Sequence, residues 1–319
     1  MSCDIVFVCQ AGELAQQSVL LAKSIRLFGG KIATASLHAI IPIPEDVYGS
    51  VRREILEFLV GLGAKLYYFR NPIDDAYKYG NKLNAFNIDY TTDDIVFLDT
   101  DMVVFDDFSG ILENKTASIL AVPNPLHWFS ENKLGGKVWK ELYAQFNLPL
   151  PQRKILARET KKEMWPYFDS SMIICSSRAN FSQYWIRVGK ALHPQDIPGK
   201  NPYLDQISLS VAISLAGLSW DTLSDEYNFD LALWFLKRRL RWIPGRADWF
   251  KLLPTFSHIK IFHYRGYRIL QQAAKQDPGF RVKFNRLLDE IPLSREIYAV
   301  PARRSLARRL SNFWDFQKQ

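Results

Sequence analysis

The hydrophobic pattern of the first hundred residues predicts strands that alternate with helices. Short apolar runs typical of buried strands are separated by stretches whose apolar residues recur at helical spacing, the first of which stops at Gly29 and Gly30. The predicted strands cover residues 4–9, 32–41, 66–69 and 95–98, and the predicted helices cover residues 14–28, 51–62 and a stretch that starts at 82. This order predicts a parallel sheet with right-handed crossovers.

The pattern of the remaining chain is less regular. Residues 130–165 are polar and punctuated by prolines, which predicts a long excursion from the sheet. Further strands are predicted at 118–122, 167–175 and 259–264, and helices at 203–216 and beyond 269. We therefore expect one α/β domain over residues 1–268, with a mixed, mostly parallel sheet flanked by helices, and a helical, basic C-terminal extension over 269–319.

Composition is consistent with a folded chain of cytoplasmic location. Apolar residues make up 48% of the 319 residues and aromatic residues 14%, enough for a sizeable core. The three cysteines are odd in number and form no metal-binding or disulfide pattern, which favours a reducing compartment. No apolar stretch approaches the roughly 20 residues that span a bilayer. The N-terminus also lacks the basic region of a signal peptide.

The net charge of +8 is concentrated in residues 233–254 and 301–319. Both segments interleave basic residues with Trp and Phe, a composition that binds anionic membrane surfaces. We expect a peripheral contact with the inner face of a membrane; the alternative is packing of these segments on their own domain. No recognised nucleic-acid module is present, so nucleic acid is not an expected partner.

The strongest chemical signal is an apolar strand that runs into Asp99, Thr100 and Asp101. In an extended chain the two carboxylates point to the same side, at the strand end where open α/β sheets bind ligands. Paired oxygens suit a hard divalent cation that bridges to a diphosphate. A phosphohydrolase of the haloacid-dehalogenase type, which also uses an Asp-x-Asp strand end, is the alternative enzyme. Such enzymes carry the motif on the first strand rather than the fourth.

Several segments, taken in order, resemble the retaining glycosyltransferases of family 8, which include glycogenin and bacterial lipooligosaccharide galactosyltransferases. The resemblance is carried by residues 12–20, 79–83, 99–101, 167–174, 203–206, 223–228 and 261–266. The last of these segments contains a His-x-x-Gly motif formed by His263 and Gly266. The resemblance implies a GT-A fold and transfer of a sugar from a nucleotide sugar, with uridine as the expected base, to a hydroxyl group with retention.

The resemblance also implies roles for individual residues. A Mn²⁺ or Mg²⁺ ion is expected on Asp99, Asp101 and His263, and an imidazole ligand favours Mn²⁺. Asp205, Gln206 and Asp169 are the expected catalytic residues. The donor is expected to contact Val8, Gln10, Lys82, Asp99, Thr100, Asp101, Ser170, Gly266 and Arg268. The implied acceptor is a carbohydrate or a lipid-linked sugar.

The sequence departs from the family pattern at three places. Asp169 and Ser171 stand where Asn and Gly are usual, and the loop at Gln10 lacks the Asp that reads the base. The Lys-Pro-Trp expected after Gly266 is absent, and we expect Arg268 to supply its cation. A catalytically inactive carbohydrate-binding relative is therefore a third hypothesis. An inverting enzyme would need a carboxylate base, for which the candidates are Asp169, Asp225 and Glu226.

Overall fold

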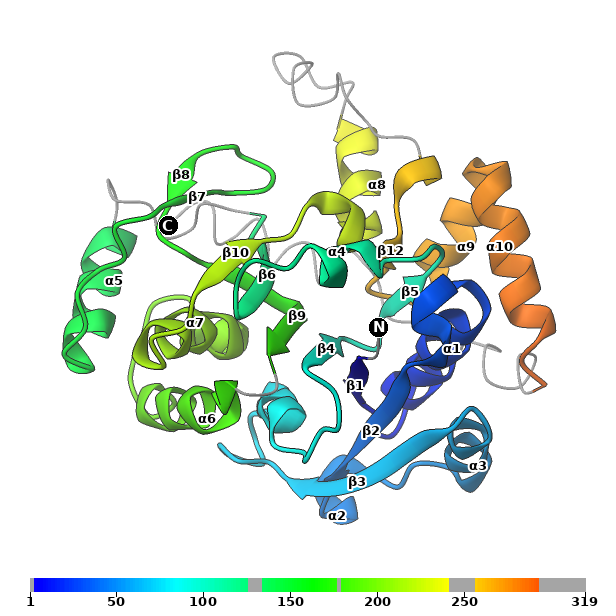
Figure 1. Ribbon diagram of the computed structural model, residues 1–319, viewed down its shortest axis with the longest axis horizontal. Helices are drawn as coiled ribbons and strands as arrows, with labels where there is room; N and C mark the ends of the chain where they lie inside the picture. The colour runs from blue at the N-terminus through cyan, green and yellow to red at the C-terminus, as the bar shows by residue number, and fades with distance from the viewer. Residues whose placement is uncertain (1–2, 126–133, 177–178, 241–255, 293–319) are drawn as a thin grey trace.

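The computed structural model describes residues 3–125, 134–176, 179–240 and 256–292. Its centre is a seven-stranded sheet in the order β10-β6-β9-β4-β1-β2-β3 (Figure 1). The strands are β1 (Asp4–Val8), β2 (Ser36–Ile43), β3 (Ala64–Arg70), β4 (Asp94–Leu98), β6 (Ile119–Pro123), β9 (Phe168–Ser176) and β10 (Trp220–Thr222). Only β9 runs antiparallel to its neighbours in this sheet. The predicted mixed, mostly parallel sheet is therefore confirmed.

The two faces of the sheet bury two separate hydrophobic cores. Side chains alternate along a strand, so Ile5 and Phe7 of β1 enter one core while Val6 enters the other. The first core lies under α1 (Glu13–Phe28), and the second under α6 (Phe181–Leu192) and α7 (Lys200–Leu215). Burial on both faces explains why these strands read as continuous apolar runs.

Two predicted element starts were wrong. The second strand begins at Ser36 rather than Ile32, because a 3-10 turn, η1 (Gly30–Thr34), precedes it. The Arg26 guanidinium fixes this turn by donating hydrogen bonds to Ala33 O and Ala35 O at 2.6 and 2.8 Å. The helix predicted from residue 82 is instead a 3-10 segment, η2 (Lys78–Phe86), which begins four residues earlier.

The long excursion after β6 contains more regular structure than its polarity predicts. Its helix α5 (Leu134–Gln145) buries Trp139, Leu142 and Tyr143 in the second core. A short hairpin of β7 (Ile155–Leu156) and β8 (Glu163–Met164) follows before the chain enters β9 (Figure 1).

A second, three-stranded sheet lies beside the end of β4. It has the order β11-β12-β5, formed by β11 (Phe229–Asp230), β12 (Ile261–His263) and β5 (Met102–Val104). Strand β5 follows the Asp-x-Asp motif directly, and β12 pairs with it antiparallel, with His263 opposite Met102. This pairing brings a residue far along the chain to the Asp-x-Asp motif.

The helices beyond residue 266 pack against the core under α1. They are α9 (Tyr267–Gln276) and α10 (Pro278–Asp289), and Asp277 caps α10 by accepting from Phe280 N at 2.7 Å. Leu270, Phe280 and Leu287 join the core under α1, next to which α10 lies (Figure 1). The helical nature of this part is as predicted; the domain boundary at 268 stays a prediction, and residues 293–319 lie outside the described part of the chain.

The remaining elements are short or connect the sheets. They are α2 (Glu45–Tyr48), α3 (Arg53–Gly61), α4 (Gly110–Glu113), η4 (Asp225–Tyr227), α8 (Leu231–Leu240) and η6 (Phe256–His258). Of the basic segment 233–254, residues 241–254 lie outside the described part. Within the described residues, no helix has the length and apolar character needed to cross a membrane.

Candidate active site

The Asp-x-Asp motif joins the two sheets. The Asp99 backbone N–H donates to Ser171 O on β9 at 2.8 Å, and Asp101 O accepts from Tyr264 N, just past β12, at 2.9 Å. The start of β9 and the end of β4 meet at one edge, because the two strands are antiparallel and Leu98 pairs with Met172. Residues from three distant segments therefore converge there.

Asp101 contacts His263, the other end of the proposed ligand set. Oδ1 of Asp101 lies 3.2 Å from Nε2 of His263, whose side chain is buried. The other ring nitrogen, Nδ1, lies 3.2 Å from Oδ1 of Asn228. The Asn228 amide is oriented in turn by a 2.7 Å hydrogen bond from its Nδ2 to Oγ of Ser171. This series of hydrogen bonds favours a proton on Nδ1 and directs Nε2 toward Asp101.

Asp99 contacts a lysine instead. The Lys82 ammonium lies 3.1 Å from Oδ2 of Asp99 and 3.2 Å from Oδ2 of Asp205. It also lies 3.3 Å from Oγ of Ser170. The turn that carries Lys82 needs glycine at position 80, since a Cβ there would stand 2.4 Å from Oδ1 of Asn71.

Asp205 is buried at the start of α7 and held from several directions. Tyr77 donates to its Oδ1 at 2.9 Å, and its backbone N–H donates back to the Tyr77 hydroxyl at 2.9 Å. The Ser170 hydroxyl donates to its Oδ2. Burial and the Asp205 charge raise the pKa of Tyr77, so this phenol stays a neutral donor. No sequence motif singled out Tyr77, which comes from the loop before η2.

Gln206 follows Asp205 in α7, and Asp169 lies on β9. Oε1 of Gln206 accepts hydrogen bonds from Asn124 Nδ2 at 2.8 Å and from the Tyr167 hydroxyl at 3.2 Å. Asp169 accepts a hydrogen bond from Ser171 N, two residues further along β9, at 3.0 Å.

Three cations lie near enough to Asp169 to change its ionisation. Burial opposes ionisation, yet the pKa of Asp169 is lowered by the charges of His263, Arg265 and Arg158. A carboxylate with a lowered pKa is a weak base.

The remaining predicted donor residues are spread along this edge. Val8 ends β1, and the nearby Gln10 accepts from Asn81 Nδ2 at 3.2 Å. Thr100 is buried between the two aspartates. Gly266 is the residue before α9, and Arg268 lies exposed in the first turn of that helix.

Arg265 is a further cation of the site that sequence reasoning missed. Its Nε donates to Oδ2 of Asp230 at 2.8 Å, and its charge lowers the pKa of Asp101 and of Asp169. It adopts a left-handed backbone conformation with φ 56°, which is rare for a residue with a side chain. Its place inside the His-x-x-Gly motif was the available signal.

The two aspartates of the motif titrate in opposite directions. Burial raises the pKa of Asp99 to about 6, opposed by Lys82 and reinforced by the charge of Asp101. Burial also disfavours ionisation of Asp101, but His263 and Arg265 outweigh it and lower its pKa to about 2. The pKa of His263 rises because Asp101 outweighs the effect of burial.

The donor atoms at this edge suit a divalent cation in their chemistry. Two carboxylates and an imidazole whose second nitrogen is held by an amide match the ligands and the supporting shell of such sites. No three His, Cys, Asp or Glu side chains are gathered as a metal cluster in the part of the chain that the structure describes. Asp101 and His263 are in contact, whereas the Asp99 carboxylate engages Lys82.

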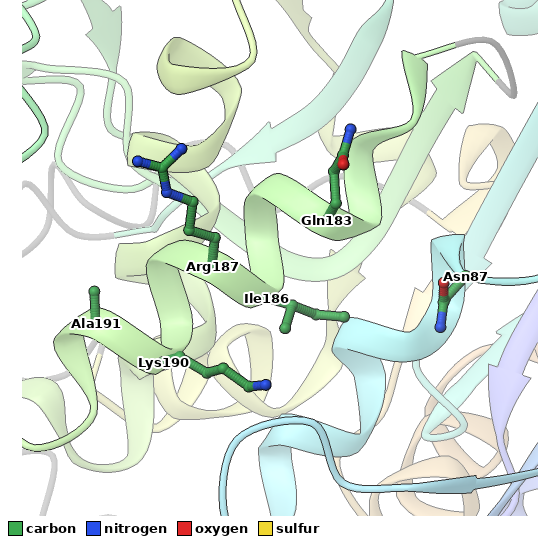
Figure 2. A pocket seen from close by; sticks show the side chains of 6 residues that line it. All are labelled: Asn87, Gln183, Ile186, Arg187, Lys190 and Ala191. Carbon is green, nitrogen blue, oxygen red and sulfur yellow. The ribbon is translucent and has the colours of Figure 1, made fainter.

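A shallow hollow elsewhere on the surface contains none of these residues. It lies on α6 (Figure 2), where Ile186 and Lys190 point toward the segment that carries Asn87. Its lining residues are Asn87, Gln183, Ile186, Arg187, Lys190 and Ala191. The chemical groups therefore gather at the sheet edge, not in this hollow.

Comparison with known proteins agrees with the glycosyltransferase that the sequence predicts. The family model of the Rhodobacterales glycosyltransferase domain matches residues 5–217, more than half of the chain. No curated protein matches the chain by sequence.

Solved structures share the fold. WbbM, a bifunctional glycosyltransferase, superposes with a TM-score of 0.60 at 16% identity, covering 93% of this chain and 51% of that chain. The apo form of GlyE from Streptococcus pneumoniae TIGR4 superposes with a TM-score of 0.51 at 13% identity, covering 91% and 64%. The chain thus spans about half of WbbM and less than two thirds of GlyE. At this identity the likeness shows the fold alone.

Membership of a glycosyltransferase family displaces the phosphohydrolase hypothesis, and the superpositions agree with the sheet topology described above. The chain belongs to the Rhodobacterales glycosyltransferase domain family and is a glycosyltransferase with a GT-A fold.

Proposed function

We propose that the chain transfers a sugar from a uridine-diphosphate sugar to a hydroxyl acceptor with retention, using Mn²⁺ or Mg²⁺ held by Asp99, Asp101 and His263. The observation that carries this proposal is the contact of Asp101 with His263 at the same sheet edge as the Lys82, Asp99 and Asp205 cluster. The pair proposed to bind the metal and a buried carboxylate thus lie at one edge, which supports donor binding and glycosyl transfer there.

The protein groups have separable roles in this reaction. When bound, the cation neutralises the charge that develops on the outer phosphate of the leaving nucleotide. His263 is held for this task by Asn228, and Arg265 adds a fixed positive charge nearby. Lys82 balances the charges of Asp99 and Asp205. If Asp99 held a cation, Lys82 would be available to bind the donor.

Retention is supported by the state of the carboxylates. An inverting transfer needs a base, but the lowered pKa of Asp169 makes it a poor one. Asp225 and Glu226 belong to η4, outside the cluster around Asp205. Asp205 is instead fixed by Tyr77 and Ser170, an arrangement suited to stabilising positive charge on a sugar carbon.

The proposals for the acceptor and for the cellular location are supported by the sequence alone. A carbohydrate or lipid-linked acceptor at the cytoplasmic face of a membrane matches the basic, aromatic segments 233–254 and 301–319. Vesicle co-sedimentation with anionic and neutral lipids tests this part. Equal recovery with both lipids contradicts the membrane contact.

The inactive-relative hypothesis is opposed by the geometry around the departures from the family pattern. Ser171, which replaces a glycine, supplies the hydroxyl that orients Asn228 against His263. Asp169 accepts a hydrogen bond from Ser171 N, and the charges of three cations act on it. The contacts of these two residues support an active enzyme.

A thermal-shift screen of UDP, GDP, CMP and dTDP with Mn²⁺ tests the proposal. We expect one nucleotide to stabilise the chain only when both Mn²⁺ and Asp101 are present. The variant Asp101→Ala removes the response, and the matched Asp106→Ala, an exposed carboxylate shortly after the motif, keeps it. No response to any nucleotide by the folded wild-type chain contradicts the proposal.

A further inference from the structure

Arg158 is a buried arginine that the proposed mechanism does not use. It follows β7, and only 5% of its surface is exposed. Its position is fixed by the backbone, since Arg158 N donates to Asn124 O at 3.1 Å and the preceding Ala157 N donates to Lys162 O at 2.8 Å. Arg158 is therefore a buried side chain on a backbone that the fold holds in place, not a mobile side chain on the surface.

One edge of this guanidinium has no hydrogen-bond partner among the described residues. Nη1 donates to Asn228 O at 2.7 Å, but Nε and Nη2 are buried and have no hydrogen-bond partner among the described residues. The nearest carboxylate oxygen in the recorded ion pairs, Oδ1 of Asp225, lies 3.7 Å from Nε, which exceeds hydrogen-bond distance. Arg153, on the same excursion, shows the usual alternative: its Nη2 donates to Asp221 at 2.6 Å.

Arg158 adjoins the candidate active site on two sides. Asn228, whose carbonyl it binds, holds His263 through its side chain. Asn124, whose carbonyl holds the Arg158 backbone, holds Gln206 through its side chain. The guanidinium thus lies in the wall between the proposed metal ligand and the proposed catalytic amide. Its charge also lowers the pKa of Asp169.

The two donors without a hydrogen-bond partner among the described residues define the kind of ligand that Arg158 could bind. Nε–H and Nη2–H lie parallel in one plane and match the two oxygens of a carboxylate. Buried polar groups without partners are rare in folded proteins and call for a ligand or another explanation. A carboxylate matches both the positive charge and the two-donor geometry, whereas a neutral hydroxyl matches only part of that geometry.

We propose that Arg158 binds, through Nε–H and Nη2–H, the carboxylate of an acidic sugar substrate of this enzyme. The carboxylate belongs either to the transferred sugar or to the acceptor. Both sources present the same two oxygens to Nε–H and Nη2–H. This inference rests on the proposed function and adds a substrate class to it.

Two calorimetric titrations in the presence of Mn²⁺ distinguish the sources. The first compares UDP-glucuronate with UDP-glucose, and the second compares methyl glucuronoside with methyl glucoside on the chain saturated with UDP. We expect the wild-type chain to prefer the carboxylated member of one pair by about 10-fold, the size of one charge-assisted interaction. Preference in the first titration assigns the carboxylate to the donor, and preference in the second assigns it to the acceptor.

The variants decide whether Arg158 is responsible. Arg158→Lys keeps the charge but loses the fork, so it should remove the preference while UDP binding stays within about twofold. Arg153→Lys is the matched control and should keep the preference. Asp225→Asn removes the nearest competing carboxylate from an exposed position, and should strengthen the preference even if Arg158→Lys fails to fold.

The outcomes separate this inference from the proposed function. Binding of UDP with equal affinity for both members of each pair overturns the assignment of Arg158 and leaves the proposed function standing. A preference that survives in Arg158→Lys, or that Asp225→Asn leaves unaltered, also overturns it. Absence of UDP binding to the wild-type chain contradicts the proposed function itself.

Discussion

Asp99 and Asp101 differ by two positions in the chain but lie in opposite electrostatic surroundings. Asp99 contacts the flexible ammonium of Lys82, which it shares with Asp205, and its pKa is raised to about 6. Asp101 contacts the rigid imidazole of His263, and its pKa is lowered to about 2. Asp101 therefore stays ionised well into the acid range, whereas Asp99 becomes protonated as the pH falls through about 6.

The difference teaches that the two carboxylates are not equivalent as proposed metal ligands. On the Asp101 side, the hydrogen bonds from Ser171 through Asn228 to His263 fix the imidazole before anything binds. On the Asp99 side, the partner is a long side chain that can exchange a carboxylate for another anion. We infer that Asp101 and His263 form the permanent half of the site and that Lys82 and Asp99 form the half that rearranges.

Removal of the Asp101 charge should have the largest effect. Asp101→Asn deprives His263 of its partner and the cation of its strongest anion, so donor turnover should fall by about 10³-fold. Release of nucleoside diphosphate from a nucleotide sugar measures this. Asp106→Asn serves as control, and a variant Asp101→Asn with near wild-type turnover contradicts a permanent metal half.

Removal of the shared lysine should have the next largest effect. Lys82→Met leaves Asp99 and Asp205 without their common cation, so turnover should fall by about 10²-fold. The unpaired carboxylates should also lower the free energy of unfolding by roughly 3 kcal/mol, since the ammonium is largely buried. Turnover and urea denaturation measure the two effects. Lys82→Arg should recover part of both, and full activity of Lys82→Met contradicts a role for the lysine.

Removal of the amide behind His263 should act on the metal alone. Asn228→Ala frees the imidazole to rotate, so the affinity for Mn²⁺ should fall by about 10-fold. The matched variant Asn124→Ala loses the hydrogen bond to Gln206 instead, and should lower turnover while Mn²⁺ affinity is kept. Titration of Mn²⁺ in the presence of UDP separates the two, and equal Mn²⁺ affinity in both variants contradicts the distinction.

Acidification should affect the Asp99 half first. The binding-competent form of Asp99 is the carboxylate, so Mn²⁺-dependent nucleotide binding should be half lost near pH 6 and recover as the pH rises. Asp101 stays ionised throughout this range because its pKa is near 2. Thermal shifts measured from about pH 7.5 to about pH 5 test this, and a response independent of pH contradicts the raised pKa of Asp99.

The free energy of unfolding of the unliganded chain should depend on pH in the opposite direction. The pKa of Asp99 in the folded chain exceeds its ordinary value, so the folded state binds this proton more tightly than the unfolded state. The stabilisation from this group is complete below its ordinary pKa and is lost as the pH rises through about 6.

The sequence predicted the parts of this site that local pattern determines. The Asp99 and Asp101 pair was visible because an apolar strand ends there, and His263 because a glycine follows at a fixed spacing. The sheet was predictable for the same reason, as apolar runs buried on both faces alternate with helical periods.

The supporting residues could not be predicted because tertiary contacts alone select them. Tyr77, Asn124 and Arg158 come from irregular segments without a repeat or motif, and each gains its partner from a residue dozens of positions away. The start of β2 was wrong for a similar reason: Arg26, on another element, captures the carbonyls that would otherwise extend the strand.

The most direct measurement is the set of products that the purified chain forms from UDP-sugars with Mn²⁺, followed by NMR. We predict release of UDP and free sugar in the absence of an acceptor, with the anomeric configuration of the donor retained in the first product, and loss of both in Asp101→Asn. Release of inorganic phosphate in place of UDP, or unchanged donor with a chain that binds UDP, would contradict glycosyl transfer at this site.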